Sequence, residues 1–330
     1  MSNDAGHIAE QPSMGRIIPD PGPETRPAMV VVTCAGRSGS KWMLRLLDFH
    51  PETLCRNEPA RMHPWLVDRA VGDWDAWYGR AMDVGPRIGF VDRAPADSKA
   101  HLRAWARFTR ADLPLYSKMF QKLLGRTPEA RYPRMIFHPG RVARAQRVLK
   151  LINARYFICR MLEETDHIPV IHIVRHPGGM LNSWLNRFAP TNDRDALFET
   201  QQGILQKIHE RDPGYAEVTG PIEGMEMGEM KLWCWRHAQD HMLRLGDTHP
   251  RYVPVVFERL SRDPLGVMAP VYALCGLEFT DRMRTLIERE TADSEGIADA
   301  WKRKLSGDHV ALIERVLDGS RVGGLLAARA

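Results

Sequence analysis

A cluster of glycine, serine and cationic residues near the N-terminus has the composition of a phosphate- or sulfate-binding turn. It reads Gly36-Arg37-Ser38-Gly39-Ser40-Lys41-Trp42 and follows the apolar run Ala28–Cys34. A glycine-containing turn between a strand and a helix directs backbone N–H groups to one point, where the helix dipole adds positive potential. Further donors come from four side chains, those of Arg37, Ser38, Ser40 and Lys41. A turn that only connects a strand to a helix is the alternative interpretation.

The same segment departs from the Walker A pattern of nucleotide kinases, GxxxxGK[ST]. Gly39 stands two residues before Lys41 rather than one, and Trp42 occupies the position of the hydroxyl residue that would ligate magnesium. We therefore expect this turn to bind its anion without a metal ion.

A second candidate for anion binding follows the apolar run Val170–Val174. Arg175 comes directly after this run, Pro177 follows, and Ser183 lies eight residues after Arg175 in a predicted helix. An arginine at a strand end and a serine near a helix N-terminus can bind the same phosphate. An arginine that pairs with a nearby carboxylate is the alternative.

The elements that must position these residues alternate along the chain. Strands are predicted at Ala28–Cys34, Val148–Ile152, Val170–Val174 and Tyr252–Phe257, and helices at Ser40–Phe49, Gly179–Arg187, Met230–Leu245, Pro264–Cys275 and Asp308–Leu317. This alternation is typical of α/β proteins, in which helices cover both faces of a mainly parallel central sheet. Ligands of such sheets bind beyond the carboxyl ends of the strands, so both turns are expected there.

The pattern predicts one domain with a tail and two insertions. Residues 1–27 are rich in proline and glycine and have no periodicity, which predicts a flexible tail. The single domain is then 28–330, and irregular insertions are predicted at about 55–147 and 189–228. Because long insertions in compact α/β cores are usually lids or binding loops, a substrate pocket is expected there.

The composition excludes several classes of protein. The 330 residues are 44% hydrophobic and 26% charged, which excludes a disordered or collagen-like chain. No run of 18 apolar residues is present, so no transmembrane segment is expected, and Met1–Gly15 lack the features of a secretory signal. The five cysteines are scattered and never spaced as CxxC, so neither a zinc site nor a disulfide framework is predicted. A cytoplasmic location is expected.

Positive charge is concentrated in residues 121–160. This block holds ten Lys/Arg and one acid, a local charge of +9 against a whole-chain net charge of +5. Such a block is typical of contact with nucleic acid, a phospholipid surface or a phosphorylated small molecule, or it is a solvated helix face. Arg141, Arg144 and Arg147 have helical spacing without interleaved aromatic residues, so nucleic-acid binding is not expected.

The two turns together resemble the motifs of sulfotransferases that use 3′-phosphoadenosine 5′-phosphosulfate (PAPS). In that family a turn of the form [PG]-[KR]-S-G-[TS]-x-[WL] binds the 5′-phosphosulfate and corresponds here to 36–42. A later strand that ends in R-x-P, with a serine eight residues after the arginine, binds the 3′-phosphate; here these are Arg175, Pro177 and Ser183. The resemblance implies a P-loop-like α/β/α fold, PAPS as sulfuryl donor, no metal, and a hydroxyl-bearing acceptor: a small molecule, lipid or carbohydrate.

The resemblance also implies a general base. Glu58 lies eight residues after His50, which is followed by proline, and the carbohydrate and tyrosylprotein branches carry their base at about this offset. The cytosolic branch uses the histidine of a K-x-H pair instead, and here Ile152 stands at that position. The resemblance therefore favours Glu58 as base, whereas a surface carboxylate paired with a neighbouring arginine is the alternative.

Two cations are implied in catalysis. Lys150 lies 25 residues before Arg175, close to the offset of a catalytic lysine in the tyrosylprotein branch. Lys150 and Arg37 would stabilise charge on the oxygen that leaves with adenosine 3′,5′-bisphosphate. A lysine that extends from a strand end to water is the alternative for Lys150.

The sequence departs from the family in two places. Lys41 stands where threonine is common, and the RKGxxGDW cofactor loop of the cytosolic branch is missing. Trp301, Lys302 and Arg303 would cover the nucleotide in its place, or they form a solvated helix start. Two other functions stay open: a metal-dependent P-loop kinase, which Trp42 disfavours, and a non-catalytic anion-binding protein that uses the basic block 121–160.

Overall fold

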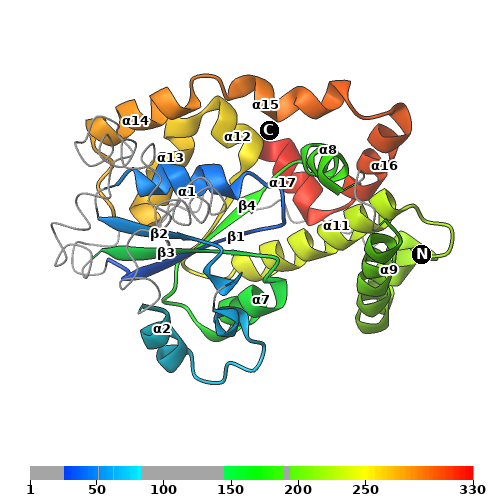
Figure 1. Cartoon of the computed structure of the whole chain (residues 1–330), viewed down its shortest axis with the longest axis horizontal. Helices are drawn as coiled ribbons and strands as arrows, with labels where there is room; N and C mark the ends of the chain where they lie inside the picture. Colours follow the sequence, from blue (N-terminus) through cyan, green and yellow to red (C-terminus); the bar gives the residue numbers. More distant parts are fainter. Residues whose placement is uncertain (1–25, 51, 62, 83–144, 189–193, 330) are drawn as a thin grey trace, which may run out of the picture.

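The computed structural model of the protein describes residues 26–50, 52–61, 63–82, 145–188 and 194–329 (Figure 1). The predicted tail lies almost entirely outside the described residues. So does 83–144, with Arg141, Arg144 and much of the basic block. All five cysteines are described, and each is buried and free. Among the described helices, none combines the length and apolarity that crossing a membrane requires.

Five parallel strands form the central sheet. They are β1 (Met29–Cys34), β2 (Thr53–Asn57), β3 (Gln146–Ile152), β4 (Val170–Val174) and β5 (Tyr252–Val256), in the spatial order β2-β3-β1-β4-β5. The chain leaves β1 toward β2 and later crosses to β4 on the other side of β1. The turns after β1 and β4 therefore lie side by side at the point where ligands bind in such sheets. The predicted α/β class is confirmed.

Helices cover both faces of this sheet (Figure 1). One face packs against α1 (Ser40–Asp48), α12 (Phe257–Arg262), α13 (Pro264–Leu274) and α14 (Asp281–Thr291); the other packs against α2 (Trp74–Met82), α7 (Arg155–Glu164) and α11 (Met227–Gly246). Along β1, Val30 and Val32 enter the first core and Met29 and Val31 the second. A strand buried on both faces reads as a continuous apolar run, which is why the sequence revealed β1.

A third core lies beside the carboxyl end of the sheet (Figure 1). Besides α11, this core takes residues from α8 (Pro177–Phe188), α9 (Arg194–Arg211), α10 (Pro213–Thr219), the 3₁₀ helix η4 (Ala300–Arg303), α16 (Gly307–Leu317) and α17 (Arg321–Arg329). The short helix α15 (Glu295–Asp299) directly precedes η4. Two short 3₁₀ helices, η2 (Pro59–Arg61) and η3 (Pro64–Val67), follow β2. These elements surround the turns that carry the candidate site.

Much of the segment 189–228, expected to be irregular, is helical. Residues 194–211 form α9 and 213–219 form α10. Pro213 stands at the start of α10, where a missing N–H costs nothing, and the Asp212 side chain accepts from the backbone N–H of Tyr215. Pro213 therefore begins a helix within a segment that was expected to be irregular.

Part of the basic block 121–160 is a strand, where a solvated helix face was one of the expectations. Arg147 belongs to β3 and is buried, and its guanidinium donates to the carbonyl oxygens of Ala145 and Met82. Arg147 therefore lies on a strand, and not on the helix that the spacing of the three arginines Arg141, Arg144 and Arg147 would fit. The guanidinium of Arg147 is hydrogen-bonded to backbone carbonyl groups inside the fold, and not exposed to solvent as on a solvated helix face.

Candidate active site

The turn after β1 has the backbone shape that its glycine requires. Gly39, the residue before α1, has φ of +79°, in the left-handed region. A Cβ at Gly39 would lie 2.3 Å from two ring carbons of Phe257, so no larger residue fits. Ser38 within this turn is only 1% exposed, and among the described residues its hydroxyl has no hydrogen-bond partner. A buried, unsatisfied donor in such a turn is a feature of an anion site.

Replacing Gly39 by alanine is expected to destabilise the fold by about 2–5 kcal/mol, because left-handed backbone strain adds to overpacking against Phe257. Chemical denaturation would measure this. Gly36→Ala is the matched control: a Cβ there would meet its nearest atom, Oδ1 of Asn153, at an ordinary 3.6 Å, so a change below about 1 kcal/mol is expected. Equal losses for both variants would contradict the role given to Gly39.

The rest of the turn lies around this glycine. Ser40 begins α1, is buried and forms a side-chain hydrogen bond with the Cys34 thiol. Lys41 is exposed in the first turn of α1. Trp42 packs edge-on against Phe257, with ring centroids 5.7 Å apart. At the position where a Walker A loop has a Ser or Thr hydroxyl, this chain has the ring of Trp42, which makes an apolar contact with Phe257.

Backbone strain is concentrated at the carboxyl edge of the sheet. Three described residues other than glycine have positive φ: Arg37 (72°), Glu58 (56°) and Asn153 (54°). They follow β1, β2 and β3, which are neighbours in the sheet. Such conformations cost about 1–3 kcal/mol each and cluster at functional sites. The strained edge therefore coincides with the predicted site.

The second turn meets the first. Nε of Arg37 donates to Oγ of Ser183 at 2.9 Å, and Nη1 of Arg175 donates to the carbonyl oxygen of Arg37 at 3.0 Å. Together they border a pocket of about 310 Å³, lined by Arg37, Arg175, Gly179, Asn182, Ser183, Asn186, Ile297 and Ala300. The structure thus brings Arg37, Arg175 and Ser183, which are far apart in sequence, to one cavity.

Arg175 is held in place by its surroundings. Its guanidinium lies 4.5 Å from the centroid of the Phe257 ring, and a Cβ at Gly179 would be 2.7 Å from its Nε. Burial lowers the pKa of Arg175, whereas the charge of Glu258 opposes that shift. Its Nε has no hydrogen-bond partner among the described residues. A held, partly unsatisfied guanidinium at a pocket wall is suited to an incoming oxyanion.

Glu258 is a site residue that sequence reasoning missed. It comes two residues after β5 and is 5% exposed, and its Oε1 accepts from the backbone N–H of His176 at 3.1 Å. Burial raises the pKa of Glu258 to about 6, although that N–H and the charge of Arg175 oppose the shift. Its position after a predicted strand was the signal that could have found it.

Replacing Glu258 by glutamine is expected to change how stability depends on pH. Because the folded-state pKa of about 6 lies above the ordinary 4.5, ionisation of Glu258 costs the folded state about 2 kcal/mol. This cost is absent below about pH 4.5 and complete above about pH 6. The variant should therefore gain about 2 kcal/mol on the wild type between pH 4 and 7, measured by urea unfolding. Stability curves of variant and wild type that stay parallel over this pH range would contradict this.

Lys150 and Glu58 form a buried ion pair. Nζ of Lys150 lies 3.0 Å from Oε1 of Glu58 and donates to Oδ1 of Asn57 at 2.8 Å. Lys150 is 1% exposed and Glu58 9%, so the lysine does not extend to water. Burial lowers the pKa of Lys150, while the carboxylate of Glu58 opposes that shift and the charge of Lys41 adds to it. The two predicted catalytic residues therefore touch.

The C-terminal segment proposed to cover the nucleotide lies beside the second turn. Trp301 is buried, stacks on His176 with centroids 4.6 Å apart, and closely contacts Gly178 at the start of α8. Lys302 is exposed and pairs with Asp299 at 2.8 Å, and Arg303 is exposed. Trp301 thus supports the turn after β4, whereas the two cations face solvent.

A comparison with solved structures matches the chain to three sulfotransferase structures at low identity. The sulfotransferase domain of the olefin synthase from Synechococcus PCC 7002 is 18% identical, with a TM-score of 0.42 over 88% of this chain and 94% of that one. The sulfotransferase domain of the curacin biosynthetic pathway is 12% identical, with a TM-score of 0.43 over 88% and 96%. The sulfotransferase STF9 from Mycobacterium avium is 16% identical, with a TM-score of 0.40 over 81% and 68%.

Sequence families give the decisive comparison. No curated protein matches the chain. The profile of the Sulfotransferase family, in contrast, matches residues 27–281. This match covers most of the chain, from β1 through the turn after β4 and β5 to the start of α14. The chain therefore belongs to the sulfotransferase family.

Proposed function

We propose that this sulfotransferase moves the sulfuryl group of PAPS to a hydroxyl oxygen of an acceptor, without a metal ion. The observation that carries the proposal is the convergence of Arg37, Arg175 and Ser183 on one pocket. The buried pair of Lys150 and Glu58 lies at the same carboxyl edge of the sheet. Anion-binding groups and a carboxylate at one edge are what sulfuryl transfer to a hydroxyl requires.

The residues of the two turns fit PAPS. The hydroxyl of Ser38 is buried without a partner in the described ranges, and the backbone amides at the start of α1 lie beside it, which suits the 5′-phosphosulfate. Arg175 and Ser183 would bind the 3′-phosphate, which distinguishes PAPS from ATP. Trp301 supports that turn through His176. Lys302 would contact the nucleotide only after its ion pair with Asp299 breaks. Arg303 is exposed beside it.

The chain supplies a base and positive charge. PAPS, when bound, would supply the sulfuryl group, and its bond from sulfur to the bridging oxygen would break as adenosine 3′,5′-bisphosphate leaves. Glu58 accepts the proton of the acceptor hydroxyl, whose oxygen forms the new bond to sulfur. Lys150 holds Glu58 at 3.0 Å, and Lys150, Arg37 and the amides of the turn stabilise charge on the leaving oxygen. These cations take the place of a metal, in keeping with Trp42 at the magnesium-ligand position.

The acceptor is proposed to be a hydroxyl-bearing small molecule, lipid or carbohydrate. A cytoplasmic location is part of the same proposal, and it is supported by five free, buried cysteines. The chemistry at Glu58 needs only an O–H group within hydrogen-bond reach of the carboxylate.

Calorimetric titration with adenosine 3′,5′-bisphosphate tests the proposal. The titration is made with EDTA present, and 5′-AMP serves as the ligand that lacks only the 3′-phosphate. Adenosine 3′,5′-bisphosphate is expected to bind the wild type with micromolar affinity. Neither 5′-AMP binding to the wild type nor adenosine 3′,5′-bisphosphate binding to Arg175→Ala is expected to reach that affinity. Equal binding of both nucleotides, or binding that EDTA abolishes, would overturn the proposal and favour a P-loop kinase. Arg282→Gln, an exposed change on α14, is the matched arginine control.

A further inference from the structure

Three guanidinium groups surround one tyrosine ring outside the nucleotide pocket. Their Cζ atoms lie 4.7, 4.5 and 5.5 Å from the centroid of Tyr156, for Arg69, Arg155 and Arg211 respectively. The three arginines come from the segment after η3, the start of α7 and the end of α9. We call Arg69, Arg155 and Arg211 around Tyr156 the arginine cradle.

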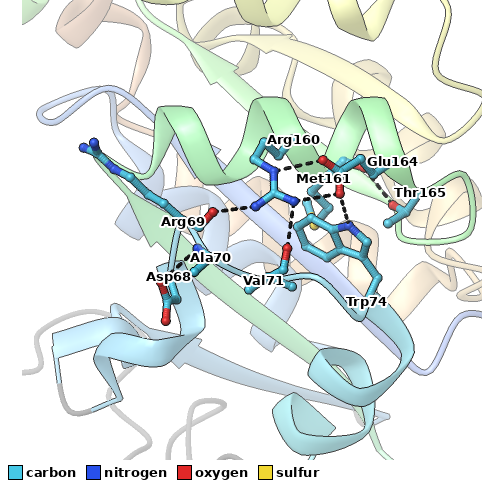
Figure 2. A network of polar contacts seen from close by, with 9 residues as sticks. All are labelled: Asp68, Arg69, Ala70, Val71, Trp74, Arg160, Met161, Glu164 and Thr165. Carbon is cyan, nitrogen blue, oxygen red and sulfur yellow. Dashed lines mark hydrogen bonds and ion pairs between the residues drawn. The ribbon is translucent and has the colours of Figure 1, made fainter.

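A hydrogen-bond network fixes the backbone at Arg69 (Figure 2). The guanidinium of Arg160 donates to the carbonyl oxygen of Arg69 at 2.5 Å and to that of Val71 at 2.7 Å. Glu164 holds Arg160 at 2.9 Å and also accepts from Nε1 of Trp74 at 2.7 Å. Figure 2 shows the side chain of Arg69 extending out of this network. The first arginine is therefore presented from an anchored loop.

Arg155 is held by a relay through a histidine. Nη1 of Arg155 lies 3.1 Å from Nδ1 of His237, whose Nε2 lies 3.3 Å from Oδ2 of Asp212. Burial, with the charge of Arg155, lowers the pKa of His237 to about 4, so the ring is neutral at pH 7. Nε2–H then donates to Asp212, and Nδ1 accepts from Arg155. Arg155 also donates to the Tyr156 hydroxyl at 2.7 Å.

The cradle carries positive charge that the described residues do not neutralise. Within the described ranges, no carboxylate forms an ion pair with Arg69, Arg155 or Arg211. Three acids are adjacent in sequence to these arginines: Asp68, Glu210 and Asp212. Asp68 accepts from the backbone N–H of Ala70, and Asp212 contacts His237 and accepts from the backbone N–H of Tyr215 at the start of α10. One tyrosine face offsets little of the repulsion among three cations. Such a cluster gains most by binding a carboxylate or phosphate, which guanidinium groups bind in a bidentate manner.

The cradle lies at the same sheet edge as the proposed reaction centre. Asn153, the strained residue after β3, packs beside Gly36: a Cβ there would lie 3.6 Å from its Oδ1. Tyr156 follows three residues later, so its Cα is within about 11 Å of that of Asn153. The backbone N–H of Glu58 donates to the carbonyl oxygen of Lys150 at 3.1 Å, and Tyr156 lies six residues after Lys150. Six residues span at most about 20 Å, which an elongated acceptor molecule can bridge.

We propose that the arginine cradle binds an oxyanion, a carboxylate or phosphate, that the acceptor carries apart from the hydroxyl that is sulfated. This rests on the proposed function, and it narrows the acceptor to an anionic alcohol. The fixed backbone of Arg69 and the relay to Arg155 make the cradle preformed. The spacing between the cradle and Glu58 then selects acceptors by length.

Matched acceptors test the proposal. Binding of adenosine 3′,5′-bisphosphate is measured first. If this nucleotide does not bind, the proposed use of PAPS is wrong, and that result is distinct from a failure of the cradle to bind an oxyanion. Transfer of label from [³⁵S]PAPS is then followed for ω-hydroxy carboxylic acids of increasing chain length, their methyl esters, and the corresponding ω-hydroxyalkyl phosphates. One chain length of an anionic series should exceed its neutral counterpart about tenfold or more in kcat/KM. The acid and phosphate arms show which oxyanion is preferred.

Removal of two cradle charges supplies the second measurement. In Arg69→Gln/Arg211→Gln the ratio of anionic to neutral kcat/KM should fall to near one, through KM of the anionic acceptor, whereas Arg282→Gln keeps the ratio. Unchanged melting temperature and nucleotide binding show that the variant is folded. The proposal is overturned if neutral acceptors react as fast as anionic ones, if no anionic acceptor is sulfated, or if the preference survives the double substitution.

Discussion

Glu58→Gln is expected to lower kcat by about 10²–10⁴-fold while the affinity for adenosine 3′,5′-bisphosphate stays within about twofold. Glutamine keeps the shape of the side chain and an oxygen toward Lys150, which lies 3.0 Å away. It cannot take a proton from the acceptor hydroxyl. The measurement is the single-turnover rate with saturating PAPS.

Glu52, the carboxylate at the other end of β2, provides the control variant for Glu58→Gln. Glu52 lies just before β2, at the opposite end of the strand from Glu58, and its side chain is 59% exposed beside Arg26. Glu52→Gln should keep the wild-type rate. A Glu58→Gln rate within about fivefold of wild type would show that another group removes the proton.

The sheet was predictable where the strands are buried on both faces. Val170–Val174 was predicted with its observed bounds, because every residue of β4 is buried and apolar runs mark such strands. β2 was missed, since Arg56 interrupts the apolar pattern of Thr53–Asn57 and asparagine, here Asn57, is depleted in strands. Arg56 is nonetheless buried in the fold. The pattern of apolar residues therefore could not predict β2, the strand that precedes Glu58.

The site was predictable only in part, because its residues meet through tertiary contacts. The two turns were found from local chemistry, and Arg37, Arg175 and Ser183 do meet. Glu58 and Lys150 came from a family resemblance rather than from the pattern. Their direct contact needs the pairing of β2 with β3, which places Asn57 opposite Lys150.

Two further residues were within reach of the sequence. Asn153 and Glu258 follow predicted strands, at the ends where ligands bind, and asparagine tolerates the left-handed backbone found there. The arginine cradle was out of reach, since it joins residues 69, 155 and 211 across α7 and α9, and α9 itself was not predicted. Spacing along the chain carries no trace of such a contact.

Lys150→Met is expected to lower kcat by about 100–1,000-fold, the usual loss for one group that stabilises developing charge. Methionine fills the buried volume but leaves Glu58 without its cation. An uncompensated buried charge costs about 3–5 kcal/mol, so the free energy of unfolding should fall as well. The rate alone would then not separate a catalytic role of Lys150 from a structural one.

The double variant Lys150→Met/Glu58→Gln separates the two roles. Removing the carboxylate relieves the unpaired charge, so stability should recover most of what Lys150→Met lost. Activity should not recover, because base and cation act as one unit and the double variant should be about as slow as the slower single. If Lys150 only balanced Glu58 in the folded protein, Lys150→Met alone would keep kcat near wild type in the folded fraction. Measuring unfolding and single-turnover rates on all four proteins therefore decides whether Lys150 acts on the reaction or on the fold.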